Sequence, residues 1–199
     1  MAATNYILTG QAAATLSSFS SGTPVTSRRL PSLGTYQVDL GRNIKRFRIK
    51  LGDLVQLMKD TTGTSKVFEQ NDAFAIIPIN KGEAIEWAAL AVISADTNAI
   101  TLTVGDTGST AGYITSVTAN ATGITVTDAS AANLTVATTP AVVGKPCKVY
   151  TADDAIVLKL TSAALPATNT VDCTTFVEVA VKYLPIFPDA KLLGLTGRL

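Results

Sequence analysis

The chain has 199 residues, is 47% hydrophobic and 16% charged, and carries a formal net charge of +1. This length is ample for the core of one domain, and so small a net charge gives no general attraction to nucleic acid or to an acidic surface. Histidine is absent, which excludes Ser-His-Asp and Cys-His catalytic systems and His-ligated zinc. No phosphate-binding or dinucleotide-binding glycine motif occurs, so we predict no cofactor.

The chain shows no secretion or membrane signal. Its first residues lack the basic start and unbroken apolar run of a signal peptide, and no window reaches the roughly 18 apolar residues that span a bilayer. We therefore expect a protein that is made in a cytoplasm, stays soluble and has no membrane partner. Its two cysteines, Cys147 and Cys173, could pair, but in a reducing compartment isolated thiols are more often buried small residues.

The two ends of the chain differ from its middle. Residues 1–34 are rich in Ala, Ser and Thr, contain two prolines and show no sustained periodicity, so we interpret them as an extended N-terminal arm. Residues 185–199 begin with two closely spaced prolines, which end the last strand, and continue as an apolar C-terminal tail. Residues 35–184 are left as the folded domain.

Within this domain, apolar and polar residues alternate. The stretch TFVEVAVKY, residues 175–183, is the clearest case, and ITLTV at 100–104 and AIVLKL at 155–160 follow the same rule. A period of two with one apolar face is typical of a half-buried antiparallel strand. The chain is also rich in Thr and Val, which favour strands.

Two further stretches are more continuously apolar. AFAIIPI, residues 73–79, and IEWAALAVI, residues 85–93, fit strands deep in a two-layer core, although the second could also be a buried helix. Segments rich in Gly, Pro, Asn and Asp separate the runs at intervals of roughly ten residues, which is typical of a β-sandwich or barrel. No amphipathic helix of normal length intervenes. We predict an all-β fold, an antiparallel sandwich.

One basic concentration occurs, in GRNIKRFRIKLGD, residues 41–53. On a strand, three cations would share one face, where they could meet phosphates or acidic side chains, or form a solvated face that protects an edge strand. No aromatic residue shares the face of the cations, so we favour a protein-facing patch over direct nucleic-acid binding. The apolar set would be Phe47, Ile49 and Leu51, and the cations Arg46, Arg48 and Lys50.

Asp106-Thr107-Gly108-Ser109 spells the D-T-G-S signature of the aspartic proteases. Those enzymes need two aspartates that share a proton, and because only one D-T-G occurs here, only a symmetric dimer could supply the pair. Gly105 also replaces the apolar residue expected before the aspartate. The alternative is a hairpin loop with Asp at a strand end and Gly for positive φ. We favour the loop, with Asp106 as a turn residue.

Other carboxylates offer weaker sites. The loop residues Asp96, Asp106 and Asp128 could ligate calcium, but none lies in a D-x-[DN]-x-[DN]-G array, so we favour turn capping and predict no metal site. The adjacent Asp153 and Asp154 would point to opposite faces of a strand, which favours a turn that enters a strand over a paired-carboxylate site.

Two stretches carry a resemblance to a known type of protein. GDTGSTAGYITSVTANATG, residues 105–123, and the segment from YTADD to FVEVAVKY, residues 150–183, resemble a recurring type of tailed-bacteriophage virion protein. The turn at residues 79–82 is similar to that type's turn between two apolar strands, and the resemblance covers about residues 50–184. It implies a jelly-roll-like β-sandwich that binds the phage particle as a capsid decoration (cement) or head-fibre-type component, with no catalytic residues.

We therefore predict a non-enzymatic structural protein on the capsid surface of a virion, assembled in the host cytoplasm. It would stabilise the head by bridging neighbouring subunits of the major capsid protein, and could pair with itself as a homodimer or homotrimer at a symmetry axis. Apolar anchors in the arm and tail would offset the entropy lost when these segments are ordered. The candidate capsid contacts are Ile7, Leu8, Leu16, Phe19, Arg28, Arg29, Arg46, Arg48, Lys50, Ile186 and Phe187.

Two alternatives from other classes stay open. The first is a head-fibre or tail-associated protein that binds a host surface or a carbohydrate, usually through exposed aromatic residues in a groove. The only tryptophan, Trp87, lies in an apolar stretch that predicts a core position instead. The minor alternative is a dimeric enzyme of the aspartic-protease type centred on Asp106.

Overall fold

The computed structural model describes residues 4–8, 26–30, 35–53, 70–96, 100–126, 148–161 and 173–185. These residues are almost entirely β-structure, with one helical turn at 51–53, and none of them forms a helix long and apolar enough to cross a membrane. In chain order the strands are β1 (Thr4–Leu8), β2 (Thr26–Leu30), β3 (Thr35–Asp39), β4 (Ile44–Lys50), β5 (Ala73–Ile79), β6 (Glu83–Ser94), β7 (Thr101–Asp106), β8 (Ile114–Thr118), β9 (Gly123–Val126), β10 (Lys148–Val149), β11 (Asp154–Leu160) and β12 (Phe176–Pro185).

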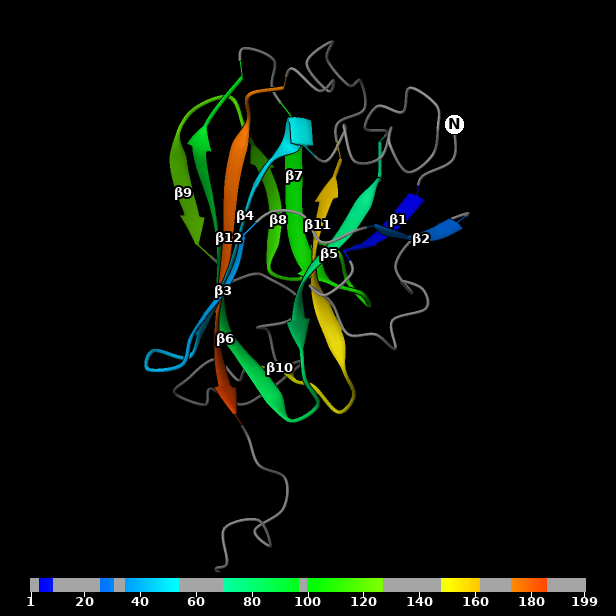
Figure 1. Cartoon of the computed structure of the whole chain (residues 1–199), viewed down its shortest axis with the longest axis vertical. Coiled ribbons are helices and arrows are strands. Elements are labelled where there is room, and N and C mark those ends of the chain that lie inside the picture. Colours follow the sequence, from blue (N-terminus) through cyan, green and yellow to red (C-terminus); the bar gives the residue numbers. More distant parts are fainter. Residues whose placement is uncertain are drawn as a thin grey trace, which may run out of the picture.

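The strands form two sheets that pack face to face (Figure 1). Sheet A has the order β2-β1-β5-β11-β7-β8, and sheet B has the order β10-β6-β12-β4-β3, with β9 also paired to β6. The all-β sandwich predicted from the alternating pattern is therefore confirmed. The stretch at 85–93 that could have been a helix lies within strand β6.

Eight of these strands make a jelly roll. In the chain order β4, β5, β6, β7, β8, β9, β11, β12, the first strand pairs with the last, the second with the seventh, the third with the sixth and the fourth with the fifth. The pairs β12–β6 and β11–β7 then join the halves of each sheet. All six pairings are antiparallel, as in a long hairpin rolled into two packed sheets, which is the double Greek key of a jelly roll.

Two strands from the predicted arm extend sheet A beyond the jelly roll. β1 pairs in parallel with β5, and β2 pairs in parallel with β1. β5 therefore has a hydrogen-bonded neighbour on each side, because β11 pairs along its other edge. Since β5 is buried along almost its whole length, removal of the arm would expose the edge of an apolar strand.

The core lies between the sheets, and the two sheets differ in how burial varies along their strands. Strand β4 alternates, with Phe47 and Ile49 at most 2% exposed and Arg48 between them facing outward. Strands β5, β7 and β11 of sheet A are buried on both faces, as their continuous apolar runs indicate. Each fully buried Val, Ile, Leu or Phe stabilises the fold by about 1.5–3 kcal/mol before entropy is subtracted.

Candidate functional site

The D-T-G-S loop begins at the last residue of β7. One carboxylate oxygen of Asp106, Oδ1, accepts hydrogen bonds from the backbone N–H groups of Gly108 (3.0 Å) and Ser109 (2.8 Å), and the Asp106 N–H donates to the Ser109 carbonyl (3.0 Å). Such local bonds from an aspartate define an Asx-type turn. The prediction that Asp106 is a turn residue is confirmed, but the positive φ expected of the loop glycines is not found, because Gly82 is the only glycine with positive φ among the described residues.

Gly105, immediately before the aspartate, is required by the closeness of this loop. A Cβ atom at position 105 would lie 1.9 Å from the Ser109 carbonyl oxygen and 2.7 Å from the Gly112 nitrogen. Because both atoms belong to the backbone, the loop would have to move to admit any side chain. The apolar residue of the protease signature could not be accommodated here.

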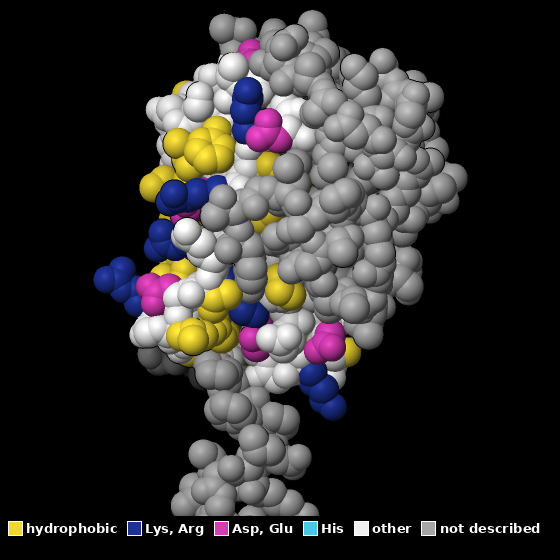
Figure 2. Space-filling model, in the orientation of Figure 1, with side chains coloured by type: hydrophobic (Ala, Val, Ile, Leu, Met, Phe, Trp, Pro, Cys, Tyr) yellow, Lys and Arg dark blue, Asp and Glu magenta, His cyan; other side chains and the backbone are white. Residues whose placement is uncertain are grey.

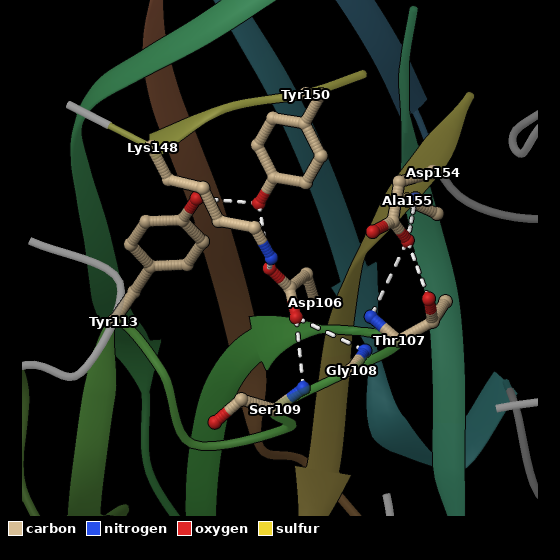
Figure 3. A network of polar contacts seen from close by, with 9 residues as sticks. All are labelled: Asp106, Thr107, Gly108, Ser109, Tyr113, Lys148, Tyr150, Asp154 and Ala155. Atoms are coloured by element: carbon tan, nitrogen blue, oxygen red, sulfur yellow. Dashed lines mark hydrogen bonds and ion pairs between the residues drawn. The ribbon is translucent and has the colours of Figure 1, made fainter. Parts of the chain in front are cut away.

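The second oxygen of Asp106 joins a buried network (Figure 3). Oδ2 forms an ion pair with Lys148 and accepts a hydrogen bond from the Tyr150 hydroxyl (2.7 Å), which lies 2.5 Å from the Tyr113 hydroxyl. The Lys148 ammonium also lies 4.7 Å from the centre of the Tyr150 ring. Burial, followed by the neighbouring Tyr113 and Asp106, raises the pKa of Tyr150 far above its usual value, so this hydroxyl keeps its proton at alkaline pH values where a free tyrosine loses it.

Neighbouring carboxylates tie further loops to the same end of the sandwich. Asp154, the first residue of β11, accepts hydrogen bonds from the Thr107 hydroxyl (2.6 Å) and from the Ala155 N–H (2.7 Å). Asp153 accepts one from the Lys81 N–H (2.9 Å) in the β5–β6 turn. The two adjacent aspartates therefore bind different partners and do not form a carboxylate pair, in agreement with a turn that enters a strand.

These contacts give the Asp106 cluster a structural role. Its carboxylate is fully buried and both oxygens are engaged by donors from the loop itself and from β10 and the residue after it. An aspartic-protease centre would need an exposed aspartate beside a second one and a water molecule. The sequence could not reveal Lys148 and Tyr150 as partners, because they lie 42 and 44 positions away from Asp106.

A second lysine–carboxylate pair lies within the sandwich. Lys45 of β4 contacts Glu83 Oε2 at 2.5 Å, donates to the Pro78 carbonyl (2.9 Å) and lies 4.7 Å from the centre of the Tyr183 ring. Glu83 also accepts hydrogen bonds from the backbone and side-chain amides of Asn80, at 3.0 and 2.9 Å. The pair fastens the β5–β6 turn, whose Gly82 has a φ of 85°, to β4 and β12.

The predicted basic face lies on the outer side of sheet B, where the described surface mixes basic, acidic and apolar side chains (Figure 2). Arg46, Arg48 and Lys50, which we call the basic strip, alternate with buried residues as expected. Arg46 and Arg48 both pair with Glu178 of the adjacent strand β12. Two of the three cations thus share one carboxylate, which lowers the charge that the strip offers to phosphates.

The other half of this outer face is apolar. Register places Ala89 beside Val126 and Ala91 beside Ile124, on the neighbouring strands β6 and β9. Ile124 is 73% and Val126 57% exposed. Trp87, two positions before Ala89 and opposite Lys182, is half-buried on this same face. The prediction of a core position for Trp87 is wrong, because its stretch is a strand with one outward face rather than a fully buried element.

The β3–β4 hairpin projects from the side of the sandwich (Figure 1). At its turn, Asp39 Oδ1 accepts a hydrogen bond from the Arg42 N–H (3.1 Å), and Asn43 adopts a φ of 54°. Leu40 at the tip is 77% exposed and Val38 is 41% exposed. An apolar tip flanked by charged residues is an arrangement that can insert into a partner's surface.

The remaining candidate contacts divide into two groups. Ile7 and Leu8 lie on β1, and Arg28 and Arg29 lie on β2, where all four belong to paired strands of sheet A. The others fall outside the described residues: Leu16, Phe19, Ile186 and Phe187.

The aspartates considered as calcium ligands and the two cysteines lie as follows. Within the described part of the chain, no group of three or more acidic or cysteine residues could hold a metal ion. Asp96 accepts hydrogen bonds from the N–H and hydroxyl of Thr174 (3.2 and 3.3 Å), whereas Asp128 lies outside the described residues. Cys173 is a buried free thiol, and Cys147 also lies outside that part of the chain.

Comparison with known proteins gives two structural likenesses. No family model and no curated protein matches the chain. A chain in the capsid of Ralstonia phage GP4 is 19% identical, with a TM-score of 0.47 over 72% of this chain and 84% of that one. A chain in the acidic-stable capsid of Helicobacter pylori bacteriophage KHP30 is 10% identical, with a TM-score of 0.43 over 79% and 94%. Both TM-scores are below one half, so we infer neither fold nor function from them.

Proposed function

We propose that this protein is a non-enzymatic structural component of a bacteriophage virion, a decoration (cement) protein that binds across neighbouring subunits of the major capsid protein. The observation that carries the proposal is the strand order, an eight-strand, two-sheet jelly roll of the kind found in viral capsid and lectin domains. This is an argument by analogy of fold. The D-T-G-S loop and the YTADD segment, which resemble phage virion proteins, add support from the sequence.

The interior of the sandwich supports a scaffold rather than a reaction centre. The carboxylates of Asp106 and Glu83 are engaged by donors from their own turns and by lysines. Groups held in this way keep loops in one conformation and do not leave a reactive atom open to substrate. We therefore assign the outer surface, and not the interior, as the part of the molecule that binds partners.

The basic strip and the β3–β4 hairpin are the surface that we assign to the capsid. Lys50 and the two arginines offer cations that acidic side chains of a shell subunit could meet. Leu40, exposed at the tip of a projecting hairpin, supplies an apolar anchor beside them. Many copies on one particle would turn such modest contacts into firm attachment.

Co-sedimentation of the full chain with capsids that lack it tests this proposal. We expect the wild-type protein to sediment with the capsids, and the R46S/R48S/K50S variant to bind at least about tenfold more weakly because it loses three cations. K81S, which removes an exposed cation from the β5–β6 turn, should bind as the wild type does. Thermal melts would show that each variant is folded. Failure of the wild-type chain to bind any capsid would overturn the proposed function.

A second candidate function is carbohydrate binding on the particle surface. One observation favours it: Trp87 is half-buried on the outer face of sheet B, where an aromatic ring could stack on a sugar. Glycan-array binding that disappears in W87A but not in W87F would support this candidate. Capsid binding by W87A at the wild-type level would show that the two functions use separate surfaces.

A further inference from the structure

The edges of the two sheets are unequally protected. A free strand edge presents unpaired N–H and C=O groups, which proteins usually guard with charged or polar residues. Among the described strands, β8 at one edge of sheet A has exposed Thr and Ser residues, and β2 at the other carries Arg28 and Arg29. Strand β3, at one edge of sheet B, carries Asp39.

The remaining edge is shared by β10, which carries Lys148, and by β9, which lacks such protection. Its four residues, Gly123–Val126, include no charge, and no described strand pairs with the side of β9 that faces away from β6 (Figure 1). The two large apolar side chains of this strand, Ile124 and Val126, are among the most exposed of the described chain. An uncharged edge with exposed apolar residues is the kind that accepts another strand.

We propose that β9 is a self-association edge that pairs antiparallel with β9 of a second copy of this chain across a twofold axis. The strand is self-complementary in one register. With Thr125 opposite Thr125 of the second copy, Ile124 faces Val126 of that copy, and Val126 faces its Ile124. The outward face then holds two apolar cross-strand pairs, and the inward face a Thr–Thr pair, both of which stabilise antiparallel strands.

The inward and outward positions are fixed by the register with β6. Thr125 lies opposite Leu90, which is fully buried and faces the core, whereas Ile124 lies opposite Ala91 and Val126 opposite Ala89 on the outer face. A pairing shifted by one residue would place Ile124 opposite a threonine and lose both apolar pairs. The proposed partner is therefore a second copy in this one register.

The pairing is expected to be weak in solution. Four residues bury far less than the roughly 1,200 Å² of a small specific interface, so we expect a dissociation constant of about 0.1–1 mM. Sedimentation velocity from about 10 µM to 1 mM would cover this range. A wild-type chain that stays monomeric throughout, or that forms only trimers, contradicts the proposal.

Charge variants test the register itself. In I124K/V126K, two pairs of introduced lysines would face each other across the axis, and we expect dimers to be lost. In I124K/V126E each lysine would face a glutamate of the second copy, and we expect dimers to return, at the wild-type level or above. Both positions are exposed in the single chain, so both variants should keep its melting temperature. Monomers in both variants would overturn the pairing.

A cysteine variant gives a second, independent readout. Directly opposed residues of antiparallel strands have Cα atoms about 4.5–5.5 Å apart, within the range that a disulfide bridges. Thr125→Cys should therefore form a covalent dimer on mild oxidation. Ser116→Cys, on the exposed edge strand β8, is the matched control and should stay monomeric. Equal cross-linking of the two variants, or none with Thr125→Cys, contradicts the proposed contact. None of these tests needs the phage particle, so they stand or fall independently of the proposed function.

Discussion

Two lysines near one end of the sandwich each lie 4.7 Å from the centre of a tyrosine ring and bind a carboxylate in a turn, but they differ in their access to water. Lys45, paired with Glu83, has a side chain that is only 5% exposed, whereas Lys148, paired with Asp106, is 35% exposed. If the carboxylate is removed, Lys148 can turn towards solvent and Lys45 cannot. The two lysine–carboxylate pairs should therefore contribute different amounts to stability, since an unpaired charge is costly only where it stays buried.

Glu83→Gln should have the largest effect. It replaces the carboxylate beside the buried Lys45 ammonium with a neutral amide, which can still accept a hydrogen bond but no longer compensates the buried charge, so we expect the free energy of unfolding to fall by about 3–5 kcal/mol. Urea unfolding would measure the loss. Glu86→Gln, at a partly exposed carboxylate paired with Lys182, is the control and should cost less than about 1 kcal/mol. A loss below 1 kcal/mol in Glu83→Gln would show that Lys45 is not trapped.

Asp106→Asn should cost less, about 1–3 kcal/mol. The asparagine oxygen can still accept from the Gly108 and Ser109 N–H groups, and Lys148 can reach water. The same urea series would rank the two variants. If Asp106→Asn proves more costly than Glu83→Gln, access of the lysine to solvent does not decide the difference.

Tyr150→Phe should cost about 1–2 kcal/mol at neutral pH, because it removes the buried hydrogen bonds of this hydroxyl to Asp106 and to Tyr113. The same hydroxyl also makes the stability of the wild type depend on pH. The raised pKa of Tyr150 means that the unfolded chain loses this proton near pH 10 while the folded chain keeps it. The contribution of the Tyr150 hydroxyl to the free energy of unfolding is therefore complete below about pH 10 and is lost as the pH rises further.

We accordingly expect the wild type to lose stability between pH 9.5 and 11 more steeply than Tyr150→Phe does, as measured by urea unfolding at several pH values. Tyr36→Phe, on strand β3, is a suitable control for general alkaline effects. Parallel pH profiles for wild type and Tyr150→Phe would contradict the burial of this hydroxyl.

Arg48→Ser should have the smallest effect on stability. Its ion pair with Glu178 lies on the outer face, with the arginine side chain 45% exposed, and such pairs contribute about 0–1 kcal/mol. Added salt should reduce even this difference. A loss above 2 kcal/mol would mean that the basic strip helps to hold sheet B together as well as facing outward.

Local pattern in the sequence predicted the sandwich and the turn at Asp106. The alternation in β4 and β12 gives the face of each side chain directly, and an aspartate before Thr-Gly-Ser bonds to its own loop. The partners of that aspartate could not be predicted, because Lys148 and Tyr150 reach it through strand pairings between distant segments. Trp87 was misplaced for a related reason: a strand in an apolar stretch can still turn one face outward.

The strand pairing of the arm was equally hidden. Residues 4–8 and 26–30 carry no alternation that distinguishes them from the rest of the Ser- and Thr-rich start of the chain, yet they pair in parallel beside β5. Parallel pairing leaves no hairpin turn signal to read. Point variants on the surface are therefore better probes of partner binding than deletion of the arm, which would expose β5.

The proposed function makes this chain a product of a phage genome, and the most direct test of that claim is quantitative mass spectrometry of purified particles of the phage, joined to a three-dimensional reconstruction of the capsid. We predict that the protein is present in a fixed ratio to the major capsid protein, and that a jelly roll sits on the shell with the basic strip and the β3–β4 hairpin against neighbouring subunits. Absence of the protein from the particles would contradict the account.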